Sequence, residues 1–223
     1  MALFQLKAAY RMVIKKISYI SLFIVALHSC HSKNEQLPFY NTADFTAEWI
    51  NKNDPAYASI HTIDCFQFTD QSGHLINQDS LAGHVYIANF FFTSCGSICP
   101  KMINNLGMVQ DSFLTNDAVK LISFSVMPWA DSVKRLHEYA ETHHIHNNKW
   151  HLLTGDKTKI YILGRQSYFS EKKAGLGKDS SEFLHTESIL LIDKKSRIRG
   201  IYAATDTAQI KRVIADIRIL LQE

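Results

Sequence analysis

The sequence predicts an α/β fold in which a central mixed sheet carries helices on both faces and an N-terminal β-hairpin precedes it. The first observation is that, from about residue 60 onward, apolar residues alternate between the periods of strands and helices, without internal repeats. The second is the composition of the 223-residue chain, 46% hydrophobic and 20% charged, which excludes collagen-like, coiled-coil and wholly disordered proteins. This length predicts one domain with appendages.

The first predicted elements are a hairpin, a buried strand and a helix. Phe66–Phe68, followed by the polar segment Asp70–Gly73, predicts a strand that enters a turn. Val85–Phe92 is nearly all apolar and rich in β-favouring residues, which is typical of a central strand covered on both faces. The next apolar residues recur at helical spacing and predict a helix: Met102, Leu106, Val109 and Phe113.

The second half of the chain continues the alternation. Val119–Val126 predicts an interior strand, and Asp131 or Ser132 is the expected N-cap of the helix that follows. Residues 150–153 predict a short strand, and Asp156 is the expected cap of another helix. Two strands, at 188–193 and 200–203, are joined by the polar turn at 194–196. A final helix has this apolar stripe: Ile210, Val213, Ile214, Ile217 and Leu221.

This order of elements fits a thioredoxin-like fold with an N-terminal hairpin and one inserted helix. The order is hairpin, β, α, β, α, short β, α, β, β, α. The pattern alone also admits other three-layer α/β arrangements. The positions of the cysteines narrow the choice.

Residues 1–29 are expected to form a signal peptide of the lipoprotein type. Two lysines precede an apolar run of 11 residues, Ile17–Leu27, which has the length of a signal-peptide core and is too short to span a bilayer. The run ends in Leu27-His28-Ser29-Cys30, which resembles a bacterial lipobox, so we expect Cys30 to carry lipid. The alternatives are a plain secretory signal and a short membrane anchor.

The expected organisation after the signal is a lipidated Cys30 with a membrane tether over residues 30–57, then one domain over residues 58–223. The tether is predicted from its polar composition and from Pro38 and Pro55. These features predict an exported protein of the cell envelope, anchored through lipid on the periplasmic side of a membrane.

The charge distribution argues against a nucleic-acid partner. The formal net charge is +3, but residues 1–29 hold four Lys or Arg residues and no acid, so the remainder has a net charge of −1. Nucleic-acid binding requires Lys and Arg clustered on the folded part of the chain. We therefore expect no nucleic-acid partner.

The chain has four cysteines, and two of them are placed where chemistry is expected. Cys95 and Cys99 directly follow the predicted central strand and directly precede a helix. An α/β sheet commonly places reactive groups at the carboxyl end of such a strand. Pro100 suits the first helical position, so we expect Cys99 at the helix cap, where unpaired backbone N–H groups favour the thiolate. Cys65, beside Phe66, is expected to be a small buried hydrophobe.

Three residues separate Cys95 from Cys99, and their sulfurs can point the same way on a helical turn. They could close a disulfide or hold a soft cation. Two thiolates with one imidazole would suit Cu(I). A purely stabilising disulfide is the alternative for an exported protein. It is less favoured, because a bridge across so few residues restrains the unfolded chain little.

Several segments together carry a family resemblance: Asp70-Gln71-Ser72-Gly73, Leu81-Ala82-Gly83-His84, Phe90 to Pro100, Ser125-Val126-Met127-Pro128, Leu152-Leu153-Thr154-Gly155, and His185-Thr186 followed by Leu190-Leu191-Ile192-Asp193. From about residue 37 to the C-terminus, the chain resembles the SCO/SenC family of copper-binding, thioredoxin-like proteins. The resemblance implies that Cys95, Cys99 and His185 bind copper. Met127 and Leu184 stand where the family often has Asp, so a carboxylate is missing at these two positions.

Two functions from different classes fit this site. In the first, the protein is a metal carrier, and the resemblance implies that it delivers copper to the CuA centre of cytochrome c oxidase. Its partner would then be the oxidase subunit with that site or an assembly factor, and no small-molecule substrate is needed. In the second, the protein is a membrane-tethered thiol-disulfide oxidoreductase in which Cys95 attacks a partner's disulfide and Cys99 resolves the intermediate. His185 separates the two, because only the carrier requires it.

Two further features have more ordinary interpretations. His143, His144 and His146 form a dense tract that could bind metal, but solvated surface histidines are the favoured interpretation. Trp129, in a loop after Pro128, is either a docking residue or packs against its own helix. A thiol peroxidase is less favoured, because no Thr or Pro pattern surrounds a lone peroxidatic cysteine.

Overall fold

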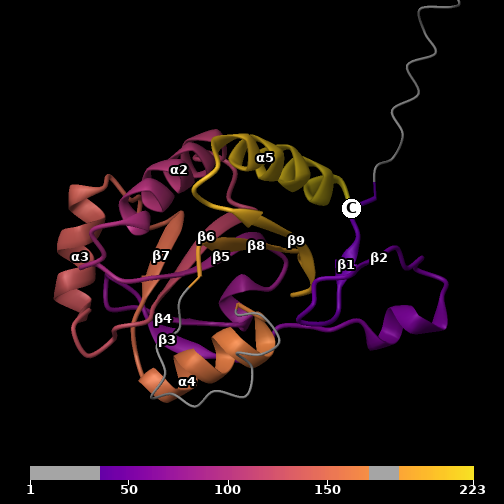
Figure 1. Cartoon of the computed structure of the whole chain (residues 1–223), viewed down its shortest axis with the longest axis horizontal. Coiled ribbons are helices and arrows are strands. Elements are labelled where there is room, and N and C mark those ends of the chain that lie inside the picture. Colours follow the sequence, from indigo (N-terminus) through magenta and orange to yellow (C-terminus); the bar gives the residue numbers. More distant parts are fainter. Residues whose placement is uncertain (1–35, 171–185) are drawn as a thin grey trace, which may run out of the picture. The chain divides into compact units, whose positions relative to one another are not determined.

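The structure is a computed structural model that describes residues 36–170 and 186–223. Its centre is a five-stranded mixed sheet in the order β7-β6-β5-β8-β9 (Figure 1). Three neighbouring strands run parallel, a fourth pairs antiparallel with one of them, and a fifth pairs antiparallel with the fourth. They are β5 (Val85–Phe91), β6 (Val119–Ser125) and β7 (Trp150–Leu153), then β8 (Ser188–Ile192) and β9 (Ile198–Ala203). The predicted mixed sheet is confirmed.

Helices cover both faces of the sheet, as predicted. On one face lie α2 (Ile98–Ser112), α3 (Val133–Thr142) and α5 (Thr207–Gln222), which share one apolar core with the sheet. On the other face lies α4 (Lys157–Ile162), which continues as the π-helical turn η3 (Leu163–Ser167). Figure 1 shows α2 and α5 on the opposite side of the sheet from α4.

Strand β5 separates the two cores because successive side chains of a strand point to opposite faces. Ile87 and Phe91 enter the core beneath α2, whereas Ala88 and Phe90 enter the core beside α4. All seven residues of β5 are buried. A strand buried on both faces needs a continuous apolar run, which explains why this strand could be predicted from the sequence.

Two small hairpins precede the sheet. The expected one pairs β3 (Gln67–Thr69) with β4 (Leu75–Asn77), and its turn contains Gly73 at a φ of 82°, a conformation that favours glycine. The other pairs β1 (Phe39–Tyr40) with β2 (Ala47–Glu48), and it is not predicted from the sequence. Strands of two residues are too short to show a period. The 3₁₀ turns η1 (Pro55–Ser59) and η2 (Asp79–Leu81) complete this part of the chain.

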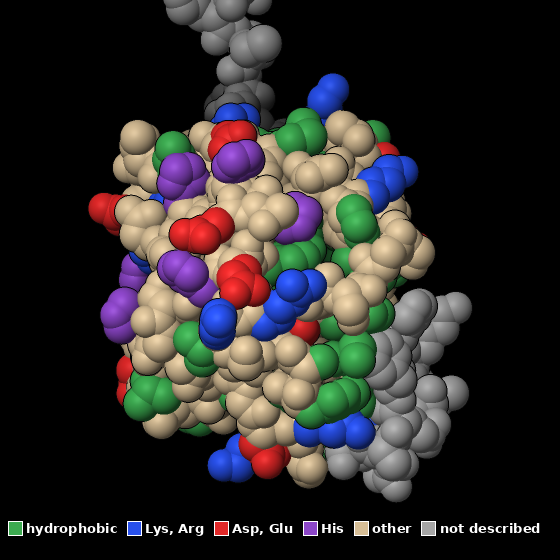
Figure 2. Space-filling view, turned by 90° about the vertical axis from the view of Figure 1, so that its left-hand side faces the viewer, with side chains coloured by type: hydrophobic (Ala, Val, Ile, Leu, Met, Phe, Trp, Pro, Cys, Tyr) green, Lys and Arg blue, Asp and Glu red, His purple; other side chains and the backbone are tan. Residues whose placement is uncertain are grey.

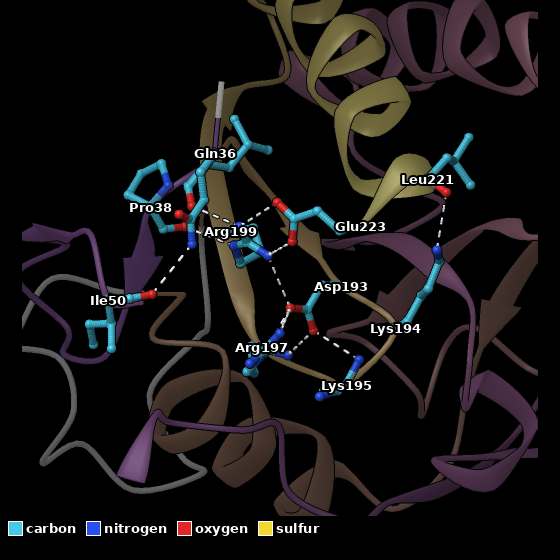
Figure 3. Close-up of polar contacts among 11 residues, drawn as sticks. Gln36, Pro38, Ile50, Asp193, Lys194, Lys195, Arg197, Arg199, Leu221 and Glu223 are labelled. Carbon is cyan, nitrogen blue, oxygen red and sulfur yellow. Dashed lines mark hydrogen bonds and ion pairs between the residues drawn. The ribbon is translucent and has the colours of Figure 1, made fainter. Parts of the chain in front are cut away.

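The segment that begins at Gln36 is held against β9 by a buried arginine (Figure 3). Arg199 donates hydrogen bonds to the carbonyl oxygens of Leu37, at 2.7 Å, and Pro38, at 3.1 Å. Its guanidinium also pairs with Glu223, at 2.7 and 2.9 Å, and with Asp193, at 3.2 Å. Residues 36–223 form one compact unit. The described part of the expected tether therefore packs on the domain, while a boundary at residue 58 stays a prediction.

Replacing Arg199 with Met is expected to lower the free energy of unfolding by about 3 to 5 kcal/mol, because it leaves the buried Asp193 and the partly exposed Glu223 without their shared buried cation. The matched control is Arg212→Met, which removes an exposed arginine 3.7 Å from Asp216 and should cost less than about 1 kcal/mol. Denaturant unfolding measures both variants. Equal stability of the two would show that the buried network does not hold the N-terminal segment.

Candidate copper and thiol site

The two paired cysteines lie at the carboxyl end of the central strand, as predicted. β5 ends at Phe91, and α2 begins at Ile98, so Cys95 sits in the connecting loop and Cys99 in the first turn of the helix. The amide of Val126 donates to the carbonyl oxygen of Phe91 at 2.8 Å, so β5 and β6 end side by side. The residues that follow β6 therefore lie next to the cysteine loop.

The two thiols differ in their surroundings. Cys95 is partly exposed, and its Sγ lies 3.7 Å from the hydroxyl oxygen of Ser97. Cys99 is 4% exposed and belongs to the same apolar core as Phe91 and Tyr139. Both are free thiols in the structure. The site thus combines an accessible sulfur with a buried one.

These surroundings separate the acidities of the two thiols. Burial raises the pKa of Cys95, but hydrogen bonds from the Cys99 thiol and from the backbone of Cys99 and Ser97 outweigh burial and lower it to about 7. Burial, the hydrogen bond with Cys95 and the charges of Cys95 and Asp131 together raise the pKa of Cys99 to about 12. Near neutral pH, the thiolate is therefore on Cys95.

The expectation that the helix start favours a thiolate at Cys99 is wrong. The helix begins one residue before Cys99, with Ser97 as its N-cap, and the Cys99 side chain is buried in the core. The Cys99 amide instead lowers the pKa of Cys95. Pro100 is the third residue of α2 rather than the first, where its lack of an N–H still costs no helical hydrogen bond.

Alkylation of the reduced, metal-free protein should distinguish the two thiols. Because the thiolate is the reactive form, we expect the rate at Cys95 to reach half its maximum near pH 7 and to fall about tenfold for each unit below that. Cys99 should stay unmodified until well above neutral pH. Iodoacetamide labelling with peptide mass spectrometry follows each cysteine separately. Faster labelling of Cys99 than of Cys95 would contradict this assignment.

A buried carboxylate holds the loop that carries Cys95. Asp131, 1% exposed, accepts hydrogen bonds from the Thr93 amide at 3.2 Å, the Thr93 hydroxyl at 2.6 Å and the Ser125 hydroxyl at 2.5 Å. The N-cap of α3 is Ser132, whose hydroxyl accepts from the amide of Arg135. The sequence predicts Asp131 only as a candidate helix cap. Its position just after a parallel strand was the signal that could have identified it as part of the site.

Met127 and Trp129 both follow β6. Met127 faces the cysteine loop, and Trp129 faces the solvent. The hydroxyl of Ser94 donates to the thioether sulfur of Met127 at 4.0 Å, so Met127 places a soft, uncharged sulfur beside the loop. Trp129 is 59% exposed, and its ring lies 4.9 Å from the ammonium of Lys157. An exposed indole near the site agrees with the docking interpretation of Trp129.

Cys65 does not have the buried position expected for it. It is exposed, because Phe66 and Phe68 point into the core and the alternation of an extended chain turns Cys65 outward. It also lies before β3, which begins at Gln67. Cys65 is therefore an exposed thiol outside the paired-cysteine site.

Two of the predicted site residues, Cys30 and His185, lie outside the described residues. Within residues 36–170 and 186–223, no three His, Cys, Asp or Glu side chains are grouped so that they could hold a metal ion. This covers His143, His144 and His146. Figure 2, which views the molecule from the α3 side, shows histidine side chains spread over this face. In the same two ranges, no helix has the length and apolar character needed to cross a bilayer.

Comparison with known families decides the assignment that the site suggests. The family model described as SCO1/SenC matches residues 55–222, about three quarters of the chain. The chain belongs to the SCO1/SenC family. This SCO1/SenC protein is 28% identical over 160 residues to a SCO1 protein homolog of Bacillus subtilis, a match that covers 71% of this chain and 82% of the relative.

Solved structures of SCO1/SenC proteins share the fold. A SCO1/SenC family lipoprotein from Bacillus anthracis has a TM-score of 0.63 and 26% identity, covering 72% of this chain and 95% of its own. BsSco, described with a disulfide switch and as a Sco-family cytochrome c oxidase assembly protein, has a TM-score of 0.62 and 27% identity over 74% and 96% of the two chains. ScoI of Arabidopsis thaliana with copper bound has a TM-score of 0.55 and 24% identity over 72% and 98%. The predicted thioredoxin-like fold is confirmed.

Proposed function

We propose that this SCO1/SenC protein is a metallochaperone that carries copper to the CuA centre of cytochrome c oxidase, with Cys95, Cys99 and His185 as the copper ligands. The observation that carries the proposal is the pair of free thiols at the end of the central strand, one accessible and one buried. Copper is the cargo in this function. The copper-bound structure of Arabidopsis ScoI and the description of BsSco as an oxidase assembly protein support the proposal.

The donor set suits the cargo. Thiolate sulfur is a soft ligand that selects Cu(I), and imidazole also binds copper. A coordinated thiol is deprotonated by the metal, so the high pKa of free Cys99 does not prevent it from binding. Bound copper would also offset the repulsion between two thiolates. The burial of Cys99 would keep water away from one side of the ion.

The course of the sheet supports His185 as the third ligand. β8 runs antiparallel to β5 with Asn89 opposite Ile189, so the chain enters β8 at the edge where the cysteine loop begins. His185 lies only three positions before Ser188, the first residue of β8, which limits the distance between their Cα atoms to about 11 Å. The third ligand is thus expected at the same edge of the sheet.

Release to a partner would proceed by exchange of ligands without net oxidation or reduction. Cys95 is the accessible sulfur, so an incoming ligand of the partner would displace it first, while the buried Cys99 keeps hold of the ion. The exposed Trp129 offers a contact surface for the partner, which we propose is the oxidase subunit with the CuA site or an assembly factor.

The second candidate, a thiol-disulfide oxidoreductase, is favoured by the unequal acidities of the two thiols. The Cys95 thiolate would attack one sulfur of a partner's disulfide, forming a mixed disulfide and releasing the other sulfur as a thiolate. Cys99 would then lose its proton and attack Cys95, releasing the second partner sulfur and closing the Cys95–Cys99 disulfide. Two electrons pass to the partner. Reduction in this way could prepare the partner's cysteines for metal.

We further propose that residues 1–29 are removed as a lipoprotein signal and that Cys30 anchors the protein on the periplasmic side of a membrane. The basic and apolar segments before Cys30 support this location, as does the Bacillus anthracis relative described as a lipoprotein. The tether would confine the domain near a membrane-bound partner and raise its effective concentration there.

A transfer assay tests the proposed function. The protein, loaded with Cu(I), is mixed with a metal-free CuA domain whose cysteines are already reduced, and metal analysis after separation locates the copper. We expect copper to move to the CuA domain. In a second arm, the reduced, copper-free protein meets the same domain with its cysteines joined as a disulfide. Reduction in the second arm without transfer in the first would favour the oxidoreductase over the carrier.

A further inference from the structure

A small basic pocket lies at the end of the molecule opposite the cysteines. It has a volume of about 110 Å³, roughly that of three to four water molecules in the liquid. It opens between η1, the turn from β8 to β9 and the end of α5. The lining residues, several of which Figure 3 shows, are Lys52, Tyr57, Asp193, Lys194, Lys195, Arg197, Leu220 and Glu223.

None of the three lysines of the basic pocket, Lys52, Lys194 and Lys195, has a carboxylate partner among the described residues. Asp193 is already used, because it accepts from the side chains of Arg197 and Arg199 and from the amide of Lys195. The ammonium of Lys194 donates to the carbonyl oxygen of Leu221 at 3.2 Å. Lys52 lines the same pocket, and the Lys195 ammonium lies 5.6 Å from the ring of Tyr57.

The acidity of Tyr57 reports the positive field in the basic pocket. Burial raises the pKa of Tyr57, but a hydrogen bond with Arg197 and the charges of Arg197, Lys195 and Lys52 outweigh burial and lower it. An anion placed beside the Tyr57 hydroxyl would gain the same attraction. The basic pocket therefore has the electrostatics of a site for a small anionic group.

An exposed tryptophan lies close in sequence to Lys52 of the basic pocket. Trp49 is 67% exposed and precedes Lys52 by three residues. The neighbouring Ile50 accepts a hydrogen bond from the side chain of Gln36 at 3.3 Å, which fixes this stretch beside the start of the described chain (Figure 3). Indole rings next to lysines are typical of protein surfaces that lie at the boundary between lipid headgroups and acyl chains.

The described chain begins at the same end of the molecule, since Arg199 binds the carbonyl oxygen of Leu37 and pairs with Glu223 of the basic pocket. Gln36 lies six positions after Cys30, and a fully extended chain over six positions spans at most about 22 Å. The cysteine site lies at the other end of the central strand. Asp193 follows Ile192, which pairs with Tyr86 near the start of β5, whereas Cys95 follows its end. Seven residues of strand separate the two ends by about 20 Å.

We propose that the basic pocket binds the headgroup phosphate of an anionic phospholipid, with Trp49 inserted at the membrane interface beside it. This contact would set the orientation of the domain on the bilayer, in addition to the anchor at Cys30. The paired cysteines and Trp129 would then face away from the bilayer, toward the extramembrane part of a partner. The inference goes beyond copper transfer and does not depend on it.

Quenching of tryptophan fluorescence by brominated lipids tests the proposal. The membrane-extracted full chain is reconstituted into phosphatidylcholine vesicles with or without phosphatidylglycerol. We expect strong quenching only with phosphatidylglycerol, retained in Trp129→Phe and lost in Trp49→Phe. Each lysine near an anionic surface contributes about fivefold to association, so Lys52→Gln with Lys195→Gln should lower the docking equilibrium about 25-fold. The matched control, Lys134→Gln with Lys159→Gln, removes the same charge from exposed positions outside the basic pocket.

Salt provides an independent check, because raising the ionic strength from about 0.1 to about 1 M shortens the screening length from about 10 to about 3 Å. We expect the quenching of Trp49 to fall as the ionic strength rises. Three results would overturn the proposal: equal quenching of Trp49 in neutral vesicles, quenching of Trp129 in place of Trp49, or an equal effect of the two double substitutions. None of these results bears on copper binding, so failure here and failure of the carrier function remain distinguishable.

Discussion

Replacing either Cys95 or Cys99 with Ser is expected to lower the affinity for Cu(I) by about 100- to 1000-fold. Binding free energies of about 10 to 16 kcal/mol for four-ligand zinc sites set the scale, at about 3 to 4 kcal/mol per ligand. A serine hydroxyl is a hard donor and does not replace a thiolate on Cu(I). Competition with a chromophoric Cu(I) chelator measures the loss.

Cys65→Ser is the matched control for these variants, since it removes an exposed thiol outside the paired-cysteine site. Its affinity for Cu(I) should equal that of the unmodified protein. Cys99 is also part of the core, so the unfolding midpoint of Cys99→Ser should be recorded beside its affinity. A folded Cys99→Ser variant that binds Cu(I) as tightly as Cys65→Ser would exclude Cys99 as a ligand.

Replacing His185 with Ala is expected to weaken Cu(I) binding by about 100-fold while leaving the dithiol chemistry unchanged. This loss of affinity is at the lower end of the 100- to 1000-fold range expected for a thiolate ligand, because imidazole is a less soft donor than thiolate. The pH at which alkylation of Cys95 reaches half its maximum should stay near 7, since its acidity is set by Cys99 and Ser97. Chelator competition and alkylation are measured on the same variant.

His137→Ala is a suitable control, because His137 is a half-exposed histidine on α3 that contacts Glu141. Its substitution should change neither the affinity for Cu(I) nor the pH at which alkylation of Cys95 reaches half its maximum. Full copper stoichiometry and affinity in His185→Ala would defeat the carrier function and leave the oxidoreductase as the better account. Loss of alkylation at Cys95 in the same variant would show instead that His185 acts on the thiols.

The parts of the fold that could be predicted are those whose pattern is local and continuous. The buried run at Val85–Phe91 identified the central strand, and the motif after it placed Cys95 and Cys99 at its end. Ser132 and Asp156 were recognisable caps, because a cap requires an oxygen at one position before a helix.

The errors concern features that depend on side-chain direction or on distant partners. The acidity of Cys99 depends on its burial against Tyr139 and other core residues, which sequence spacing does not reveal. Cys65 was misplaced because the direction of one side chain before a short strand was unknown. Arg199 binds carbonyl groups that lie more than 160 residues earlier in the chain, and no local pattern encodes such a contact.

The scaffold also explains how two thiols only four positions apart can differ in acidity. Asp131 fixes Thr93 from one side, while the backbone of the first turn of α2 lowers the pKa of Cys95. Met127 adds a thioether where the family often has a carboxylate, so the negative charge near the cysteines comes from the buried Asp131. The protein thereby keeps one thiol reactive and the other protected before metal is bound.

X-ray absorption at the copper edge of the Cu(I)-loaded protein tests the central claim most directly. We predict one copper ion with two sulfur neighbours and one imidazole nitrogen, and loss of the nitrogen signal in His185→Ala. An ion bound by sulfur alone in the unmodified protein, or a nitrogen neighbour that persists in His185→Ala, would contradict the claim that two thiolates and His185 hold the cargo.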